Sequence, residues 1–378
     1  MRIALDGRYI QDHFPGIGRY TYELARHLPP LAPEIEFLLL RNPGAPNSRF
    51  ALDGILAGPN VREVPVQATP FGLRQQWELR RTLGRQAVHL YHSPYYLMPY
   101  ALPCKTVATI HDLIPSRFPG SLPQPRLAPV YSALVRLCAR RADHLIVDSD
   151  ATLADLAHDG LSARTGATRV YLGVEPRFGP QPPDEVARHL ARAGLAGPYV
   201  LYLGINKPHK NLLALLRAWA QVAAPLRQEH TLALAGHQDA RYTEGHDLVE
   251  SLGLGESVRF VGGVSEADLP LLYAGATCFV FPSLYEGFGL PILEALACGA
   301  PVACSNVSSM PEVAGDAALL FDPTSEGEIA AALTRLLTDE ALRGRLAERG
   351  RAQARAFTWE RTAAETLGVY RRLLSRGA

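Results

Sequence analysis

The sequence predicts an α/β protein of two domains, each a parallel sheet covered by helices, that face each other across a cleft. Three observations lead to this prediction. The chain has 378 residues, more than one hydrophobic core usually supports. Short apolar runs without strict alternation are followed repeatedly by segments with helical spacing, as expected of parallel strands buried on both faces. A proline-rich break, V-E-P-R-F-G-P-Q-P-P, interrupts this pattern near the middle of the chain.

The expected elements alternate between strand and helix. After a short N-terminal strand, apolar runs suited to buried strands lie at 37–40, 107–110, 145–147, 199–203, 231–235, 278–281 and 301–303. Segments with helical spacing lie at 211–222, 240–252, 289–297 and 326–337. The break predicts a linker near 178–183, and hence one domain at 1–178 and a second at 179–357. Ligands of open α/β sheets bind outside the carboxyl ends of the strands, so we expect the functional site there.

The composition argues against several classes of partner and site. The formal net charge is +1, so no overall field selects nucleic acid. The five cysteines include no C-x-x-C pair, which argues against a disulfide framework and a zinc site. The N-terminus lacks a signal-peptide pattern, and no apolar run reaches the roughly 18 to 20 residues of a membrane span. We therefore expect a cytoplasmic protein.

Two segments leave peripheral contact with the inner face of the membrane open. Residues 71–85 and 125–141 combine apolar residues with arginines, as surface helices that bind membranes do. Ordinary amphipathic helices packed on their own domain are the alternative.

The strongest signal is F-P-S-L-Y-E-G-F-G-L-P-I-L-E-A-L-A-C-G-A-P-V at residues 281–302. A buried strand ends, a loop follows, and a helix opens at Gly289 with a proline near its first position, where proline is favoured. The backbone N–H groups of Phe288, Gly289 and Leu290 then point out of a helix N-terminus, which is a natural anion site. The segment therefore predicts a phosphate site.

Two glutamates eight positions apart flank this expected phosphate site. Glu286 lies in the loop, and Glu294 lies about one turn into the helix. We expect one carboxylate to address a sugar and the other a ribose, with neither touching the phosphate. A glutamate that merely decorates a loop or helix is the alternative.

A second anion site is expected at L-G-I-N-K-P-H-K-N-L, residues 203–212, where a strand is again followed by a glycine-containing loop and a helix start. Lys207 and Lys210 place positive charge beside a diphosphate, and Lys210 is favoured because it lies at the helix start. Gly204 and Asn206 belong to the same loop and are included in the site. Surface lysines on a loop are the alternative.

The N-terminal half contributes G-I-G-R-Y at 16–20, expected as a flexible loop before a helix at 20–28. The pattern resembles the opening of a dinucleotide fingerprint, but Thr21 stands where the third glycine should fall. We expect Gly16 and Gly18 to approach phosphates or a second substrate; a simple turn is the alternative.

A strand in T-I-H-D-L-I-P, residues 109–115, ends at His111 and Asp112. His111 can donate a hydrogen bond to a sugar or organise a leaving phosphate, and Asp112 can orient it or cap a turn. Further candidates close the neighbouring strand, expected at 88–90: Tyr91, His92 and Ser93.

The sequence D-S-D at 148–150 matches a divalent-metal pattern. Its place between a strand and a helix favours Ser149 or Asp150 as a helix N-cap instead. We therefore predict no catalytic metal.

Together with P-E-V-A-G-D-A-A-L-L-F-D-P at 311–323, these motifs resemble the retaining glycosyltransferases of GT-B fold, in the family 4-like group of mannosyl-, glucosyl- and rhamnosyltransferases of bacterial polysaccharide synthesis. The resemblance covers nearly the whole chain. It implies two Rossmann-like domains facing across a cleft, with the donor held mainly by the second. It also implies that the last helix, here about 358–378, packs back on the N-terminal domain.

The resemblance implies a role for each site residue. A stretch with Val261, V-R-F-V-G-G-V at 258–264, resembles the place where the nucleotide base rests. Family members often carry an arginine where His209 or Ile205 stands, so Lys207 is expected to supply the second positive charge. The resemblance further implies that Glu286 contacts the transferred sugar, that Glu294 binds the ribose and that Lys210 binds the diphosphate. The backbone amides of Phe288, Gly289 and Leu290 would support the sugar and the phosphates. His111 would contact the sugar or the reaction centre.

The implied reaction is metal-independent transfer from a nucleotide sugar to a glycan or lipid-linked sugar, without a cofactor. GDP-mannose is the first expectation for the donor, and UDP- and dTDP-sugars come next. No carboxylate occupies a position reserved for a nucleophile, so front-face attack with the departing phosphate as base is favoured over a covalent intermediate. The alternatives are a nucleotide-sugar-binding protein without transfer activity and an epimerase or phosphorylase of the same fold.

Overall fold

The computed structural model describes residues 1–195 and 197–375, which form two compact units. The first unit comprises Met1–Ser116, Arg126–Gly173 and the chain from Thr358 onward, and the second comprises Arg117–Pro125 and Val174–Phe357. The last helix, α16 (Trp359–Ser375), therefore belongs to the first unit. Residues 376–378 of the expected C-terminal helix lie outside the described residues.

The boundary between the units falls at 173/174, earlier than the expected 178/179. The guanidinium of Arg177 donates hydrogen bonds to Glu266. The buried ring of Phe178 lies 6.1 Å from that of Tyr273, measured between centroids. These contacts attach 174–178 to the second unit, so the linker expected near 178–183 is wrong at its start.

The first unit is built on a seven-stranded sheet of parallel pairs in the order β3-β2-β1-β4-β5-β6-β7. The order reverses between β1 and β4, which makes this pair the topological switch point. The strands are β1 (Arg2–Leu5), β2 (Glu36–Arg41), β3 (Val61–Pro65), β4 (Leu90–Ser93), β5 (Lys105–Ile110), β6 (His144–Val147) and β7 (Ala167–Arg169).

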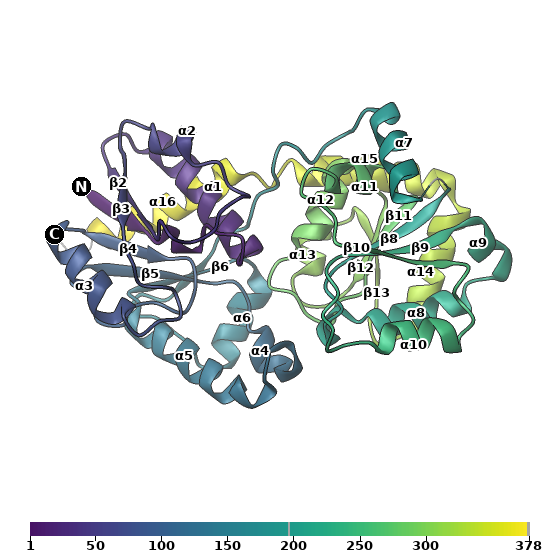
Figure 1. Ribbon diagram of the computed structural model, residues 1–378, viewed down its shortest axis with the longest axis horizontal. Coiled ribbons are helices and arrows are strands. Elements are labelled where there is room, and N and C mark those ends of the chain that lie inside the picture. The colour runs from purple at the N-terminus through teal and green to yellow at the C-terminus, as the bar shows by residue number, and fades with distance from the viewer. Residues whose placement is uncertain (196, 376–378) are drawn as a thin grey trace. The chain divides into compact units, whose positions relative to one another are not determined.

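Helices cover both faces of this sheet, and α1 packs against α16 on one of them (Figure 1). Ser149 caps α6 by accepting a hydrogen bond from the Thr152 N–H at 3.0 Å. The helical elements are η1 (Gly7–Tyr9), α1 (Pro15–Leu31), α2 (Asp53–Leu56), α3 (Gln75–Arg85), α4 (Ile114–Arg117), η3 (Pro125–Leu127), α5 (Ala128–Arg141), α6 (Asp150–His158) and α16.

The second unit is built on a six-stranded sheet of parallel pairs in the order β10-β9-β8-β11-β12-β13. Its switch point lies between β8 and β11. The strands are β8 (Tyr199–Leu203), β9 (Thr231–Ala235), β10 (Val258–Gly262), β11 (Cys278–Phe281), β12 (Val302–Ser305) and β13 (Ala318–Phe321), so β8 and β9 have the expected bounds.

The core of the second unit forms where α8 and α14 pack on the sheet. Trp219 of α8 and Leu333 of α14 are fully buried there. The helical elements are η2 (Pro119–Ser121), α7 (Pro183–Ala193), η4 (Pro208–Lys210), α8 (Leu212–Gln221), α9 (Ala224–Glu229), α10 (Glu244–Ser251), α11 (Leu269–Ala274), α12 (Leu290–Cys298), α13 (Met310–Ala314), α14 (Glu326–Thr338) and α15 (Glu340–Ala354). None of the helices in the described part of the chain has the length and hydropathy that a bilayer crossing needs.

The flexible loop expected at 16–20 is wrong, because Gly16 and Gly18 lie in the first turns of α1, behind Pro15. Gly18 is buried, and a Cβ there would lie 2.8 Å from the carbonyl oxygen of Tyr9. Its lack of a side chain therefore serves helix packing. Gly16 is exposed, with nothing within 4 Å of the position of a Cβ.

The strand expected at 88–90 is also displaced, since β4 begins at Leu90. Tyr91, His92 and Ser93 therefore lie inside β4 and are buried, and do not form a polar strand end. The Tyr91 hydroxyl donates to Asp6 at 2.6 Å. Burial lowers the pKa of His92 to about 3, so its ring is neutral and forms part of the core.

Candidate active site

Lys210 and Glu286 meet at the switch point of the second sheet. Lys210 ends η4, which follows β8, and Glu286 lies in the loop after β11. Because β8 and β11 are neighbouring parallel strands, their carboxyl ends bring the two loops together. The Nζ of Lys210 lies 2.7 Å from Oε1 of Glu286, and the two side chains are only 15% and 10% exposed. The sequence predicted both residues, but not their ion pair.

The loops that carry this pair are fixed by side-chain hydrogen bonds. Asn211 has a left-handed backbone, with φ of 58°, and its amide donates to the carbonyl oxygens of Pro282 at 3.0 Å and Pro323 at 2.8 Å. The Ser308 hydroxyl donates to the Glu286 carbonyl at 2.6 Å. The position of both charges is therefore set by the surrounding backbone.

The N-terminus of α12 opens directly after the Glu286 loop. Gly289 is the N-cap with a φ of +110°, and no side chain in the described part of the chain caps the first turn, which begins at Leu290. Phe288 is buried, with its ring 5.9 Å from that of Phe357 and its carbonyl accepting from the Ser309 hydroxyl at 2.6 Å. Backbone N–H groups of an uncapped first turn suit an anion.

Glu294 lies one turn into α12, as the sequence predicts, and is 6% exposed. Its Oε2 accepts a hydrogen bond from the Tyr273 hydroxyl at 3.0 Å. A ribose contact would therefore have to share a carboxylate that already has a protein partner, and this role stays a prediction.

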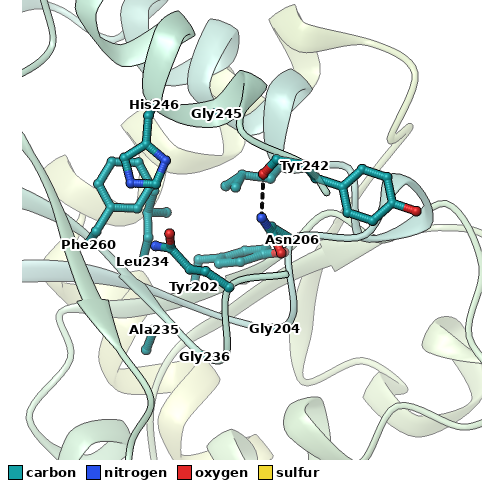
Figure 2. A pocket seen from close by; sticks show the side chains of 12 residues that line it. Tyr202, Gly204, Asn206, Leu234, Ala235, Gly236, Tyr242, Gly245, His246 and Phe260 are labelled. Atoms are coloured by element: carbon teal, nitrogen blue, oxygen red, sulfur yellow. Dashed lines mark hydrogen bonds between the residues drawn. The ribbon is translucent and has the colours of Figure 1, made fainter. Parts of the chain in front are cut away.

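A pocket lies at the carboxyl ends of β8, β9 and β10 (Figure 2). Gly204 and Gly236 let two of its loops touch, since a Cβ on Gly236 would lie 2.3 Å from the Gly204 carbonyl oxygen. The rings of His246 and Phe260 stack along one wall, with centroids 3.8 Å apart and planes at 10°. Among the described residues the buried Tyr202 hydroxyl has no hydrogen-bond partner, although it lines this pocket.

Of two residues expected in the donor site, Asn206 lines this pocket and Val261 does not. The Asn206 amide donates to the carbonyls of Asp239 at 3.1 Å and Tyr242 at 2.6 Å, so it joins two loops and its nitrogen is engaged in the fold (Figure 2). Val261 lies in β10 but is not among the residues that line the pocket, where its neighbour Phe260 stands.

The positive charge of the site comes from the two lysines. His209, which stands where the resemblance led us to look for an arginine, is 4% exposed. Burial and the nearby Lys210 lower the pKa of His209 to about 4, so its ring is neutral near pH 7. Lys207 is half-buried just before η4.

In the first unit His111 follows β5 and has a partner on each ring nitrogen. Nδ1 lies 2.6 Å from Oδ2 of Asp148, and Nε2 lies 2.9 Å from the carbonyl oxygen of Pro94. An ionised Asp148 and the Pro94 carbonyl both accept hydrogen bonds, so this geometry favours the charged imidazolium, in which both ring nitrogens donate. Burial opposes this charge, but Asp148 and the Pro94 carbonyl outweigh it and raise the pKa of His111. Burial also raises the pKa of Asp148, against the pull of His111.

Sequence reasoning missed the role of Asp148, which it read only as part of the D-S-D pattern. Asp112 caps a turn by accepting from the Ile114 N–H at 2.8 Å, one of its two expected roles. Ser149 is the N-cap of α6, as predicted. Among residues 1–195 and 197–375 no group of three His, Cys, Asp or Glu side chains is placed to hold a metal. Metal independence itself stays a prediction.

Comparison with known families matches both halves of the chain. The family described as "Glycosyl transferases group 1" matches residues 192–353, and "Glycosyltransferase Family 4" matches residues 15–178. A curated relative, O-antigen chain mannosyltransferase B of Escherichia coli, is 33% identical over 389 aligned positions, which cover 99% of this chain and 100% of the relative.

Solved structures share the two-domain architecture. Sucrose-phosphate synthase from Thermosynechococcus elongatus superimposes with a TM-score of 0.76 at 23% identity and covers 100% of both chains. The Anabaena protein HepE, solved in complex with UDP and glucose, superimposes with a TM-score of 0.74 at 21% identity, over 98% of this chain and 100% of its own.

Proposed function

Because the chain belongs to the group 1 and family 4-like glycosyltransferases and has their GT-B fold, we propose that it transfers a sugar to a glycan or lipid-linked acceptor. The first candidate for the donor is GDP-mannose, from which mannose would be transferred. The full-length relative from Escherichia coli is named as a mannosyltransferase, which supports mannose as the sugar. The Anabaena neighbour is described with UDP and glucose, which supports a nucleotide-sugar donor and keeps UDP-sugars as the next choice.

The observation that carries this proposal is the buried Lys210–Glu286 pair beside the uncapped N-terminus of α12. We assign the diphosphate to Lys210 and the N–H groups at Gly289 and Leu290, where it meets one full charge and a helix dipole. Glu286 then addresses the hydroxyl groups of the sugar. The flat wall of His246 and Phe260 suits the nucleotide base.

We propose a retaining, metal-independent, front-face reaction. The bond between the sugar C1 and the diphosphate oxygen breaks, and the acceptor oxygen bonds to C1 on the same face. The acceptor proton passes to the departing phosphate oxygen. Lys210 and the α12 backbone stabilise the charge that develops on the diphosphate, and a site excluded from water makes such stabilisation effective. Asp148 orients the ring of His111, whose role on the sugar or the reaction centre stays a prediction.

The test is a nucleotide panel followed by a transfer assay. GDP, UDP, dTDP and ADP are first compared in thermal unfolding with and without EDTA. A ligand at about a hundred times its Kd stabilises the folded protein by about 2.7 kcal/mol, which is readily measured. The matching nucleotide sugars are then incubated with oligosaccharide acceptors, and the product linkage is read by NMR. Stabilisation by GDP that EDTA does not change, with an α-linked mannose in the product, would support the proposal.

Other outcomes separate the alternatives. Nucleotide binding without any transfer or donor hydrolysis would indicate a binding protein. Loss of activity in EDTA that Mg²⁺ restores would contradict metal independence. An inverted anomeric configuration would contradict the front-face mechanism.

A further inference from the structure

One surface of the first unit is strongly basic although the whole chain has a net charge of only +1. Residues 71–85 and 126–141 contain a single acidic residue, Glu78, which pairs with Arg74 at 2.5 Å. They contain eight arginines, all of them exposed: Arg74, Arg80, Arg81, Arg85, Arg126, Arg136, Arg140 and Arg141. We call these two segments together the arginine surface.

The arginine surface also carries exposed apolar side chains. On its first segment Phe71 is 60%, Leu73 is 79% and Trp77 is 53% exposed, and on its second Leu127 is 42% and Val130 is 53% exposed. Single exposed hydrophobic residues are normal, but such a concentration marks an interaction site. The side chains of Trp77, Arg80 and Arg81 line one shallow hollow, which places an aromatic ring beside two guanidinium groups.

The two segments lie on the same face of the first sheet. Helix α3 connects β3 to β4 and α5 connects β5 to β6, and both connections advance in the same direction along the strand order. Right-handed crossovers therefore place α3 and α5 on one face and α1, which runs the opposite way, on the other. Figure 1 shows α3 and α5 along the same side of the sheet.

Direct contacts link both helices to the chain after β4. The Gln76 side chain of α3 donates to the Met98 carbonyl at 3.1 Å and accepts from the Tyr100 N–H at 3.0 Å. The Tyr131 ring of α5 lies 4.9 Å from that of Tyr96. Both helices also run antiparallel to the strands, so their N-terminal ends, where the apolar side chains lie, share the carboxyl edge of the sheet.

We propose that the arginine surface docks on an anionic lipid bilayer. Phe71, Leu73 and Trp77 enter the interfacial layer, where tryptophan is favoured, and the arginines contact lipid phosphates. A nucleic acid would match the charge but offers no apolar layer for Leu73, the most exposed of these side chains. Docking would bring the carboxyl edge of the sheet, which also carries His111, to the membrane surface.

The test is co-sedimentation of the full chain with vesicles of phosphatidylcholine alone and of phosphatidylcholine with about one third phosphatidylglycerol. We expect binding to the anionic vesicles, weaker binding to the neutral ones, and loss of binding as salt is raised. Each arginine near the surface contributes about fivefold to the binding constant, so Arg80→Gln with Arg81→Gln should weaken binding about 25-fold.

The fluorescence of Trp77 gives a second readout. Of the three tryptophans, Trp219 and Trp359 are buried and only Trp77 is exposed. Anionic vesicles should therefore shift the emission to shorter wavelength, and brominated lipids should quench it. The variant Leu73→Gln with Trp77→Gln should lose both signals and sediment less.

Matched controls come from the opposite face of the same unit. The variant Arg26→Gln with Leu31→Gln removes one exposed arginine and one apolar side chain that is 41% exposed, both on α1, and should bind vesicles like the parent. All the substituted residues are exposed, so unchanged thermal unfolding is expected and is checked first.

Several results would overturn the proposal. These are absence of binding to anionic vesicles, equal loss of binding in the α1 control, and binding of DNA that is tighter than binding of vesicles. A dimer in solution that dissociates in the Leu73→Gln, Trp77→Gln variant would assign the surface to a second copy of the chain instead. No nucleotide sugar or acceptor is present, so failure here would leave the proposed transfer reaction untouched.

Discussion

Replacing Lys210 by methionine tests the centre of the proposed donor site, because it removes one positive charge and keeps most of the volume of the side chain. The Nζ atom lies 2.7 Å from Glu286 and 5.1 Å from the ring centroid of Phe281. The free energy of unfolding and the affinity for a diphosphate should change for separate reasons. The folded state loses the partner of a buried carboxylate, and a bound diphosphate loses a cation.

The effect on stability follows from burial of the pair. Removing one partner of a buried ion pair costs about 3–5 kcal/mol, since the other charge is left uncompensated. The two side chains keep 15% and 10% exposure, so we expect the lower end of that range. For a unit of this size about 3 kcal/mol corresponds to a fall in Tm of about 6–12 °C.

The effect on binding follows from the charge of the ligand. A hydrogen bond between charged groups contributes about 1.5–3 kcal/mol, so the Kd of the nucleoside diphosphate should rise about 10- to 150-fold. The affinity for the nucleoside monophosphate should fall by less, because the second phosphate carries most of the charge beside Lys210. Loss of one group that stabilises a developing anion lowers kcat about 10²- to 10³-fold.

The assay is calorimetric titration of parent and variants with the nucleoside diphosphate that the panel selects and with its monophosphate. Lys207→Met is the matched control, and it should change stability by less than about 1 kcal/mol because Lys207 is half-buried beside solvent. Lys210→Met with Glu286→Gln removes both charges, so it should recover stability without recovering affinity. An unchanged ratio of diphosphate to monophosphate affinity in Lys210→Met would refute the assignment of the diphosphate to this lysine.

Three further predictions concern glycines and a histidine. Gly18→Ala should lower the free energy of unfolding in urea by about 1–3 kcal/mol, because its Cβ would lie 2.8 Å from a backbone oxygen. Gly16→Ala is the control and should be neutral or slightly stabilising, because nothing lies within 4 Å of its Cβ position. Equal effects of the two substitutions would contradict this packing. Gly289→Ala should cost about 1–2 kcal/mol through its φ of +110° alone, because the nearest atom is at 3.5 Å, and an unchanged Tm would show that this backbone is not strained. The folded-state pKa of His111 is raised above its ordinary 6.5. The stabilising contribution of its pair with Asp148 is therefore present below 6.5 and disappears as pH rises through the folded-state pKa, so the difference in unfolding free energy between parent and His111→Gln should shrink as pH rises. A difference that grows with pH would refute the charged ring.

The sequence predicts much of this fold because its strands are buried on both faces and therefore read as continuous apolar runs. The loop residues after β8 and β11 could be predicted for a related reason: glycine, proline and charged residues directly after such a run mark the carboxyl end of a parallel strand. The family resemblance then supplied roles for Lys210 and Glu286, and the comparisons confirm the family and the GT-B fold.

The errors arose where a local pattern has a distant cause. G-I-G suggested a loop, although Pro15 just before it is a residue typical of a first helical position, and Gly18 is required by a carbonyl nine residues upstream. Asn206 lines the pocket, as its place in a glycine loop suggested, but its amide also joins a segment more than thirty residues away, a structural role that the sequence did not indicate. Neither partner can be read from the residues alone.

The pairing of His111 with Asp148 could almost have been predicted from the sequence. Both strands were expected, and in the register of β5 and β6 Ile110 pairs with Val147, so the residues that follow each of them must emerge at the same level. Only the adjacency of the two strands was lacking. In parallel sheets, polar residues that follow two neighbouring strands should therefore be examined as pairs.

The same reasoning explains why Lys210 and Glu286 should behave as one unit in catalysis. Each is the partner that makes burial of the other tolerable, and each is assigned to a different part of the donor. The Asn211 amide and the Ser308 hydroxyl hold the two loops, so a substrate meets charges that are already in place and need little reorganisation. The effects of Lys210→Met and Glu286→Gln on kcat should then be far from additive, because the first substitution already removes the group that positions the second.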